Sequence, residues 1–184
     1  MFDLQDFVDR CKQLVRSPHP AEQILRLMRG AVKDAGSIKK VIAPADSRAP
    51  ITDAVLFRSD DLLVLNATLP PHFMSLSHDH RIWAVIGIYE GQENNVFFKR
   101  SSTRLEEVNR REVLAGEAIL LGPEVIHAVA NPLDSATLGL HVYGGDLFSA
   151  ERSMWNPHTG EELRYDVPQF FRWCKEISKR SRAV

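Results

Sequence analysis

The chain has 184 residues, of which 44% are hydrophobic and 26% are charged, and its formal net charge is −1. This length and composition predict one folded domain with an ordinary hydrophilic surface. The balanced charge argues against nucleic-acid binding through phosphates and against a polybasic membrane-surface protein. No apolar run approaches the roughly 20 residues of a spanning helix, and the acidic N-terminus is unlike a signal peptide. Two cysteines, Cys11 and Cys174, do not make a disulfide framework, so we expect a reduced, cytoplasmic protein without nucleic-acid or membrane partners.

The N-terminal part of the chain is predicted to be helical. Apolar residues over 4–15 recur every three or four positions, the spacing of one helical face, and Asp3 is placed to cap this helix. Pro20 can begin a second helix, whose apolar stripe covers 24–31 and ends near Gly36.

From about residue 51 the apolar pattern becomes that of strands. Short apolar segments alternate with turn-forming residues, which indicates a β-sandwich or barrel and not a parallel α/β sheet. The expected strands cover 54–57, 62–69, 82–89, 95–98, 117–121, 126–130 and 138–143. Near the end, Phe170, Trp173, Cys174 and Ile177 share one face and predict a closing helix.

Three histidines suggest a metal site. His78 and His80 flank Asp79, and in a strand alternate side chains point to the same face, so both imidazoles would enter one cavity. A shared metal ion stabilises two neighbouring neutral imidazoles. His127 follows a Gly122-Pro123 turn, which can return a distant ligand to the same place.

In this order the motifs resemble those of cupins, the jelly-roll barrels that carry His-x-His on one strand and a later histidine followed by asparagine, here His127 and Asn131. The resemblance implies a mainly β fold: a single domain with a helical segment over 1–40, a cupin barrel over 41–148 and a C-terminal extension with a helix over 149–184. Most cupins add a glutamate ligand shortly after His-x-His. Here those positions hold Ala84 and Val85, so three imidazoles remain and coordination positions stay open.

The segment 78–87, HDHRIWAVIG, is similar to the thiol dioxygenases of the bacterial cysteine and mercaptopropionate branch, and the similarity extends over roughly 62–155. It implies one Fe(II) per chain and catalytic roles for His141 and Tyr143. Gly139 stands where the family has a serine, which shortens the usual hydrogen-bond relay. No cysteine lies in the barrel region, so we expect no cysteine–tyrosine cross-link.

The substrate clamp matches the family least, because the early-strand arginine or glutamine is not found. Arg152, nine residues after Tyr143, is the first candidate for binding a substrate carboxylate, and Arg58 and Trp83 are further candidates. The expected partners are a small thiol and O2, and the expected assembly is a monomer or small homo-oligomer.

Two alternatives remain open from the sequence. The chain could be another metal-dependent cupin enzyme, such as a different dioxygenase or an isomerase. It could also be a non-catalytic cupin that binds a metal or a small molecule, as the missing clamp and Gly139 would allow.

Overall fold

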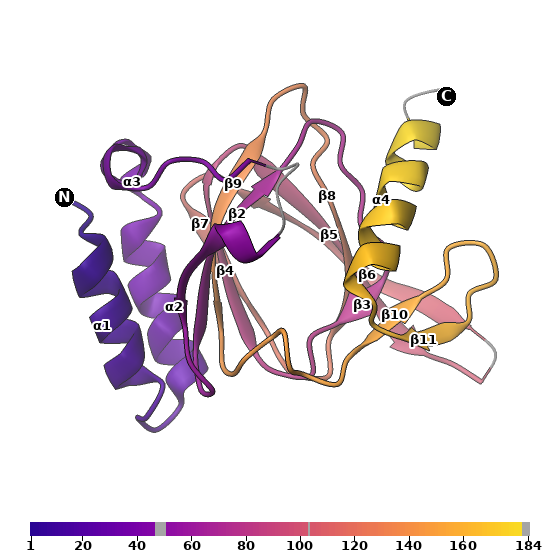
Figure 1. The fold of residues 1–184 in the computed structure, drawn as a ribbon, viewed down its shortest axis with the longest axis horizontal. Helices are drawn as coiled ribbons and strands as arrows, with labels where there is room; N and C mark the ends of the chain where they lie inside the picture. Colours follow the sequence, from indigo (N-terminus) through magenta and orange to yellow (C-terminus); the bar gives the residue numbers. More distant parts are fainter. Residues whose placement is uncertain (47–50, 103, 182–184) are drawn as a thin grey trace.

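Two antiparallel β-sheets face each other and form the body of the protein in the computed structural model, which describes residues 1–46, 51–102 and 104–181 (Figure 1). The first sheet has the strand order β1-β2-β9-β4-β7 and the second the order β11-β10-β3-β8-β5-β6. The strands are β1 (Val55–Arg58), β2 (Leu63–Leu69), β3 (His78–Asp79), β4 (Ala84–Glu90), β5 (Gln92–Arg100), β6 (Leu105–Leu114), β7 (Glu117–Leu121), β8 (Ile126–Ala130), β9 (Thr137–Tyr143), β10 (Ser153–Trp155) and β11 (Glu162–Arg164). The predicted fold class is confirmed as a mainly β barrel of two antiparallel sheets with flanking helices.

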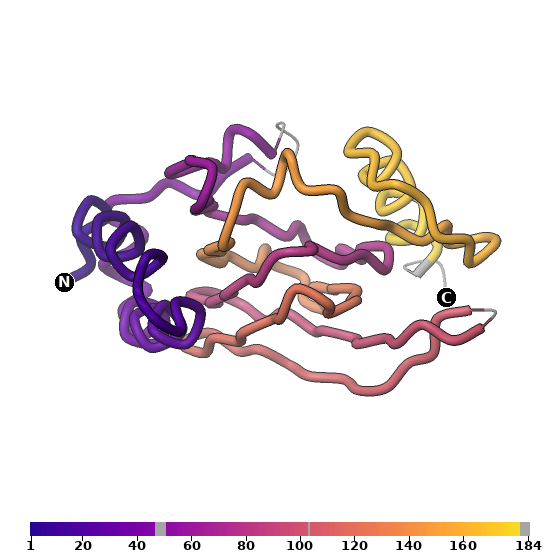
Figure 2. The backbone as a smooth tube through the Cα atoms, turned by 90° about the horizontal axis from the view of Figure 1, so that it is seen from below, coloured from indigo at the N-terminus to yellow at the C-terminus, as the bar shows by residue number. Residues whose placement is uncertain are grey.

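Three helices, α1 (Leu4–Leu14), α2 (Pro20–Ala31) and α3 (Ala35–Val41), lie together at one end of the molecule, against the outer face of the first sheet (Figures 1 and 2). Asp3 caps α1 by accepting a hydrogen bond from the Asp6 amide, and Pro20 is the first residue of α2, both as predicted. Gly87 on β4 allows the close packing of α2, since a Cβ there would come within 2.6 Å of the Met28 sulfur.

The expectation that the second helix ends near Gly36 is wrong. Helix α2 ends at Ala31, and Gly36 lies inside the separate helix α3. The Asp34 side chain accepts a hydrogen bond from the Ser37 amide and so begins α3. The capping residue Asp34 therefore divides the segment 20–41 into two helices.

The barrel interior is lined by alternate residues of both sheets. On the first sheet, the register places His141 of β9 between Leu65 of β2 and Ile86 of β4, both of which belong to the interior apolar cluster. Their neighbours in sequence, such as Val64 and Val85, face the helices instead. This alternation puts His141 and Tyr143 inside the barrel.

Strand β6 was not expected from the sequence. Six of its ten residues are exposed in succession, so it lacks the apolar alternation of a half-buried strand. It is an edge strand with Glu106, Glu107, Arg110 and Arg111, and its pairing with β5 is irregular at Val108. Charge and a bulge are ordinary ways to keep an edge strand from pairing with another chain.

Helix α4 (Val167–Ser181), at the opposite end from the N-terminal helices, closes the fold as predicted (Figure 1). Its residues Phe170 and Cys174 pack against Leu76 and Met154. Cys174 and Cys11 of α1 are both free, buried and outside the barrel strands. In the described part of the chain no helix is long and apolar enough to cross a bilayer.

Candidate metal centre

The imidazoles of His78, His80 and His127 converge inside the barrel. His78 of β3 stands opposite His127 of β8 in the antiparallel ladder, and His80 follows directly after β3. One ring nitrogen from each residue lies within 4.8 Å of the other two, and all three side chains are buried. The sequence predicted His78 and His80 on one strand, but β3 ends at Asp79 and does not include His80. The three predicted ligands are nevertheless brought together.

Hydrogen bonds set which nitrogen two of the rings present. His78 Nδ1 lies 3.0 Å from the Leu76 carbonyl oxygen, and His127 Nδ1 lies 2.9 Å from Oδ1 of Asn95. Both partners only accept hydrogen bonds, so each Nδ1 carries the proton and each Nε2 keeps a lone pair for a metal. The distance between His127 Nε2 and His80 Nε2 is 3.5 Å.

Burial keeps these rings neutral. Desolvation lowers the pKa of His78 to about 4 and holds the pKa values of His80 and His127 well below the ordinary value of 6.5. Neutral imidazole is the form that binds a metal. Three convergent neutral nitrogens without a carboxylate therefore fit a divalent transition metal such as Fe(II).

Asp79 anchors the segment that carries the two neighbouring ligands. Its carboxylate points away from the imidazoles and pairs with Arg81 Nε at 2.8 Å and with Arg100 Nη2 at 3.3 Å. It also accepts a hydrogen bond from the Ser153 amide at 2.7 Å. Arg81, the residue after His80, has a left-handed backbone φ of 58°, so the chain turns just beyond β3. The buried carboxylate thus ties β3 to β5 and to β10.

His141 and Tyr143 lie on the facing sheet, opposite the three histidines. His141 Nδ1 is 3.1 Å from the Tyr143 hydroxyl, and the Tyr143 ring meets the His80 ring edge-on with centroids 5.3 Å apart. Burial lowers the pKa of His141 to about 4 and raises the pKa of Tyr143, so both are neutral near neutral pH. The predicted pair is therefore beside the candidate metal centre.

The close packing around Gly139 leaves little room for a side chain such as serine at this position. A Cβ at this position would lie 3.2 Å from His141 Nε2 and 3.0 Å from Cδ1 of Ile88. These contacts are tighter than ordinary packing, so His141 and Ile88 occupy the space that a larger residue would need.

A cavity of about 190 Å³ connects these groups. An apolar cavity of roughly 150 Å³ already accommodates a benzene molecule, so a small ligand fits. Besides His78, His80, His141 and Tyr143, its lining includes Arg152, Tyr165 and apolar side chains such as Leu65, Leu69, Phe73, Leu147 and Phe170.

Arg152 is the basic residue of this lining. It is 7% exposed, and its guanidinium carbon lies 3.6 Å from the centroid of the Tyr165 ring. Within the described residues no ion pair includes Arg152. Since buried charges are normally paired, this cation is available for an anionic ligand.

The other two proposed substrate residues lie elsewhere. Arg58 forms a two-point ion pair with Asp146, at 3.1 and 2.7 Å, and stacks on Phe148. Trp83 packs with the cluster on the helix side, where a Cβ on Gly144 would lie 1.9 Å from its ring. Neither residue is part of the described cavity lining.

Sequence reasoning missed Asn95, Glu93 and Tyr165. Asn95 and Glu93 are both 1% exposed and hydrogen-bonded to each other on β5. The available signal was two polar residues at alternate positions of a strand, facing the same side as the apolar Phe97. For Tyr165 the sequence offers no comparable signal.

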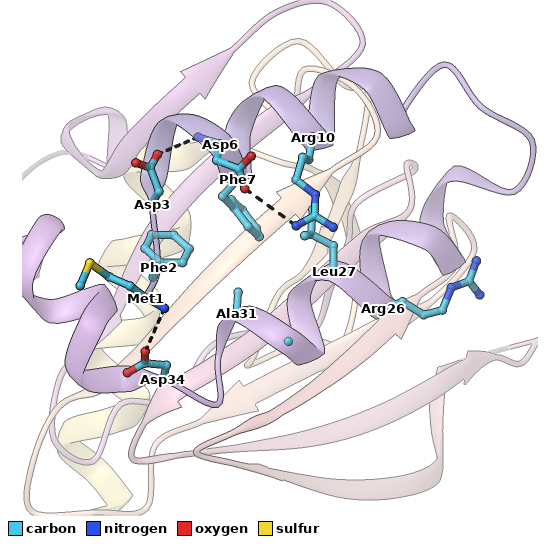
Figure 3. A pocket seen from close by; sticks show the side chains of 11 residues that line it. Met1, Phe2, Asp3, Asp6, Phe7, Arg10, Arg26, Leu27, Ala31 and Asp34 are labelled. Carbon is cyan, nitrogen blue, oxygen red and sulfur yellow. Dashed lines mark hydrogen bonds and ion pairs between the residues drawn. The ribbon is translucent and has the colours of Figure 1, made fainter.

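A larger hollow, of about 290 Å³, lies between α1 and α2 (Figure 3). Its charged groups largely pair with one another: Asp6 with Arg10 at 3.8 Å and the Met1 amino group with Asp34 at 3.9 Å. It contains no histidine or cysteine. The metal-ligating chemistry is therefore concentrated in the barrel, in the smaller cavity.

No protein-family model matches the chain. Among solved structures, it is similar to oxalate decarboxylase from Bacillus subtilis, with 19% identity and a TM-score of 0.41 over 50% of this chain and 22% of that one. It is also similar to an oxalate oxidase in complex with the substrate analogue glycolate, with 14% identity and a TM-score of 0.43 over 58% of this chain and 57% of that one. A further similar structure is procruciferin, an 11S globulin from Brassica napus, with 11% identity and a TM-score of 0.42 over 51% of this chain and 22% of that one. The chain spans less than two thirds of each of these proteins, and none of the three matches reaches an identity of 25% or a TM-score of 0.5.

Proposed function

We propose that this protein is an iron-dependent dioxygenase that oxidises a small carboxylate-bearing thiol to its sulfinic acid. In this reaction R–SH and O2 give R–SO2H, so both oxygen atoms enter the product. Sulfur loses four electrons, O2 gains them, and no other reductant is needed. The observation that carries the proposal is the placement of three groups around one cavity: the three-histidine cluster, of which His78 and His80 line the cavity, the His141–Tyr143 pair and Arg152.

His78, His80 and His127 would hold the iron through their Nε2 atoms. Bound Fe(II) supplies the positive charge that favours the thiolate over the thiol and the site at which sulfur and O2 meet. Affinity alone favours copper or zinc at an imidazole site, so the choice of iron rests on the resemblance to thiol dioxygenases.

Arg152 selects the substrate by charge. A guanidinium can hold a carboxylate through two parallel hydrogen bonds, and a buried one gains more from this pairing than an exposed one. Thr68 offers a further polar contact, because its Oγ1 is a buried side-chain atom without a hydrogen-bond partner within the described residues and it lines the same cavity. Mercaptopropionate and cysteine carry a carboxylate, whereas cysteamine does not.

Tyr143 provides a hydrogen-bond donor on the wall opposite the histidines. If neutral His141 carries its proton on Nδ1, it donates to the Tyr143 oxygen and leaves the phenol hydrogen free to point at the reacting oxygen or sulfur. The apolar side chains around the cavity exclude water, which strengthens this hydrogen bond and the Arg152 contact.

The experiment that tests this function is O2 uptake after anaerobic reconstitution with Fe(II). We expect uptake with mercaptopropionate or cysteine, formation of the corresponding sulfinate in equal amount, and little uptake with cysteamine. Uptake that ignores the carboxylate would contradict the role of Arg152. No uptake with any thiol by iron-loaded protein would favour a non-catalytic cupin or an enzyme acting on a different substrate.

A further inference from the structure

The barrel encloses a carboxylate that the proposed reaction does not use. Glu93 of β5 is 1% exposed, and Asn95 Nδ2 donates a hydrogen bond to its Oε1 at 3.0 Å. The other end of the Asn95 side chain, Oδ1, faces His127 Nδ1 at 2.9 Å. Glu93, Asn95 and His127 therefore form one buried row that ends at a candidate metal ligand.

The direction of these hydrogen bonds decides whether His127 can bind a metal. A neutral imidazole has one protonated nitrogen and one with a lone pair. Because Oδ1 of Asn95 accepts, His127 is protonated on Nδ1, and its Nε2 lone pair points toward His80 Nε2, 3.5 Å away. If the amide were turned over, its NH2 group would face Nδ1, and the proton of His127 would move to Nε2. That tautomer has no lone pair on the side of the other ligands.

The Asn95 side chain alone does not favour either orientation, because its amide oxygen and NH2 group have nearly the same shape. Glu93 distinguishes them. An ionised carboxylate only accepts hydrogen bonds, so it attracts the NH2 end of Asn95 and leaves the oxygen for His127. The burial of all three residues excludes water that could otherwise satisfy either end.

We propose that Glu93 is a positioning residue that orients the Asn95 amide and thereby fixes His127 in the tautomer that presents Nε2 to the metal. This inference depends on the three-histidine metal site of the proposed function, but not on thiol oxidation. Second-sphere partners of this kind typically change metal affinity by about ten- to a hundredfold.

Three variants with Co(II) as the probe test the proposal, at about pH 8, above the pKa of about 7 that burial gives Glu93. Glu93→Leu removes the acceptor and should weaken Co(II) binding about ten- to a hundredfold. Glu93→Gln keeps the shape but can present either end of its amide to Asn95, so its Co(II) affinity should lie between those of the wild type and Glu93→Leu. Tyr89→Phe is the matched control, since it removes a buried hydroxyl that donates to Asn66 at 2.8 Å on the helix side of the first sheet. Its Co(II) affinity should equal that of the wild type.

A second measurement reads the tautomer directly and needs no metal. In metal-free wild-type protein with nitrogen-15-labelled histidine, long-range NMR couplings should show His127 protonated on Nδ1. In Glu93→Leu the Nε2-protonated form should appear. Wild-type His127 protonated on Nε2, or Glu93→Leu with wild-type Co(II) affinity, would overturn the inference while leaving the metal site intact. Failure of the wild type to bind Co(II) would overturn the metal site of the proposed function as well.

Discussion

The Nε2 atoms of His80 and His127 lie 3.5 Å apart, although 47 positions separate the two residues in the sequence. Two nitrogens that bind one ion at about 2.1 Å stand roughly 3.0–3.4 Å apart in octahedral or tetrahedral geometry. Little movement is therefore needed for both to bind the same ion. Their close approach while buried and neutral is the geometry of a metal site formed before the metal arrives.

Replacing His80 should remove the metal. In His80→Ala the remaining two imidazoles form an incomplete ligand set, and the metal content after reconstitution with Fe(II) should fall to near background. His72→Ala is the matched control, because His72 is half-exposed in a turn and pairs with Asp134 at 2.8 Å. Elemental analysis of both proteins checks this prediction, and full metal retention by His80→Ala would contradict the site.

Arg152 should matter more for substrate binding than Arg58. In Arg152→Ala the substrate carboxylate loses a charge-assisted pair worth about 1.5–3 kcal/mol, which corresponds to a rise in KM of about 10- to 160-fold. Arg58→Ala breaks an exposed pair with Asp146 outside the cavity and should leave KM unchanged. Steady-state kinetics with mercaptopropionate decide between them, with metal content measured in parallel. Equal KM values for the two variants would reject the assignment.

Tyr143→Phe should slow turnover without loss of metal or fold. The variant removes one hydroxyl from the cavity wall and keeps the ring that packs edge-on against His80. A preorganised donor to the reacting atoms contributes about 3–4 kcal/mol, so kcat should fall about a hundredfold or more. We expect the lower end of this range, because Gly139 supplies no serine to support His141. Wild-type kcat in an iron-loaded Tyr143→Phe protein would exclude a catalytic role.

Glu93 should make the metal-free protein less stable as the pH rises. Burial raises its pKa from the ordinary value of 4.5 to about 7. The folded protein then keeps this proton to a higher pH than the unfolded chain does. The contribution of protonated Glu93 to the free energy of unfolding is therefore fully present below pH 4.5 and is lost as the pH rises through 7. Metal-free Glu93→Gln should therefore be up to about 3 kcal/mol more stable than wild type near pH 8, with little difference below pH 4.5. Urea unfolding at both pH values measures this, and a variant equally stable or less stable near pH 8 would contradict it.

The candidate ligand histidines were predictable because the chemistry of a metal site restricts both residue type and spacing. His78 and His80 stand two apart, and His127 follows a Gly-Pro turn. The strands that carry a buried face were likewise visible from apolar alternation, whereas β6 was not, because its residues are mostly exposed and charged.

The residues that support the site could not be predicted, because long-range pairing sets their roles. Asp79 meets Arg100 and the Ser153 amide, which are distant in sequence. Arg58 was a further clamp candidate after Arg152, and nothing in the sequence indicated its pairing with Asp146, 88 positions away. Glu93 and Asn95 in an otherwise ordinary strand gain significance only from His127, which the neighbouring strand β8 brings to Asn95.

The most direct test of the central claim is the fate of the oxygen atoms. Fe(II)-loaded protein is supplied with mercaptopropionate and isotopically labelled O2, and the product is analysed by mass spectrometry. A thiol dioxygenase at the three-histidine centre should give a sulfinate in which both oxygen atoms carry the label, with one O2 consumed per product. Loss of this product in His80→Ala would connect the reaction to the site. An unlabelled or singly labelled product, or a disulfide in place of the sulfinate, would contradict the proposed function.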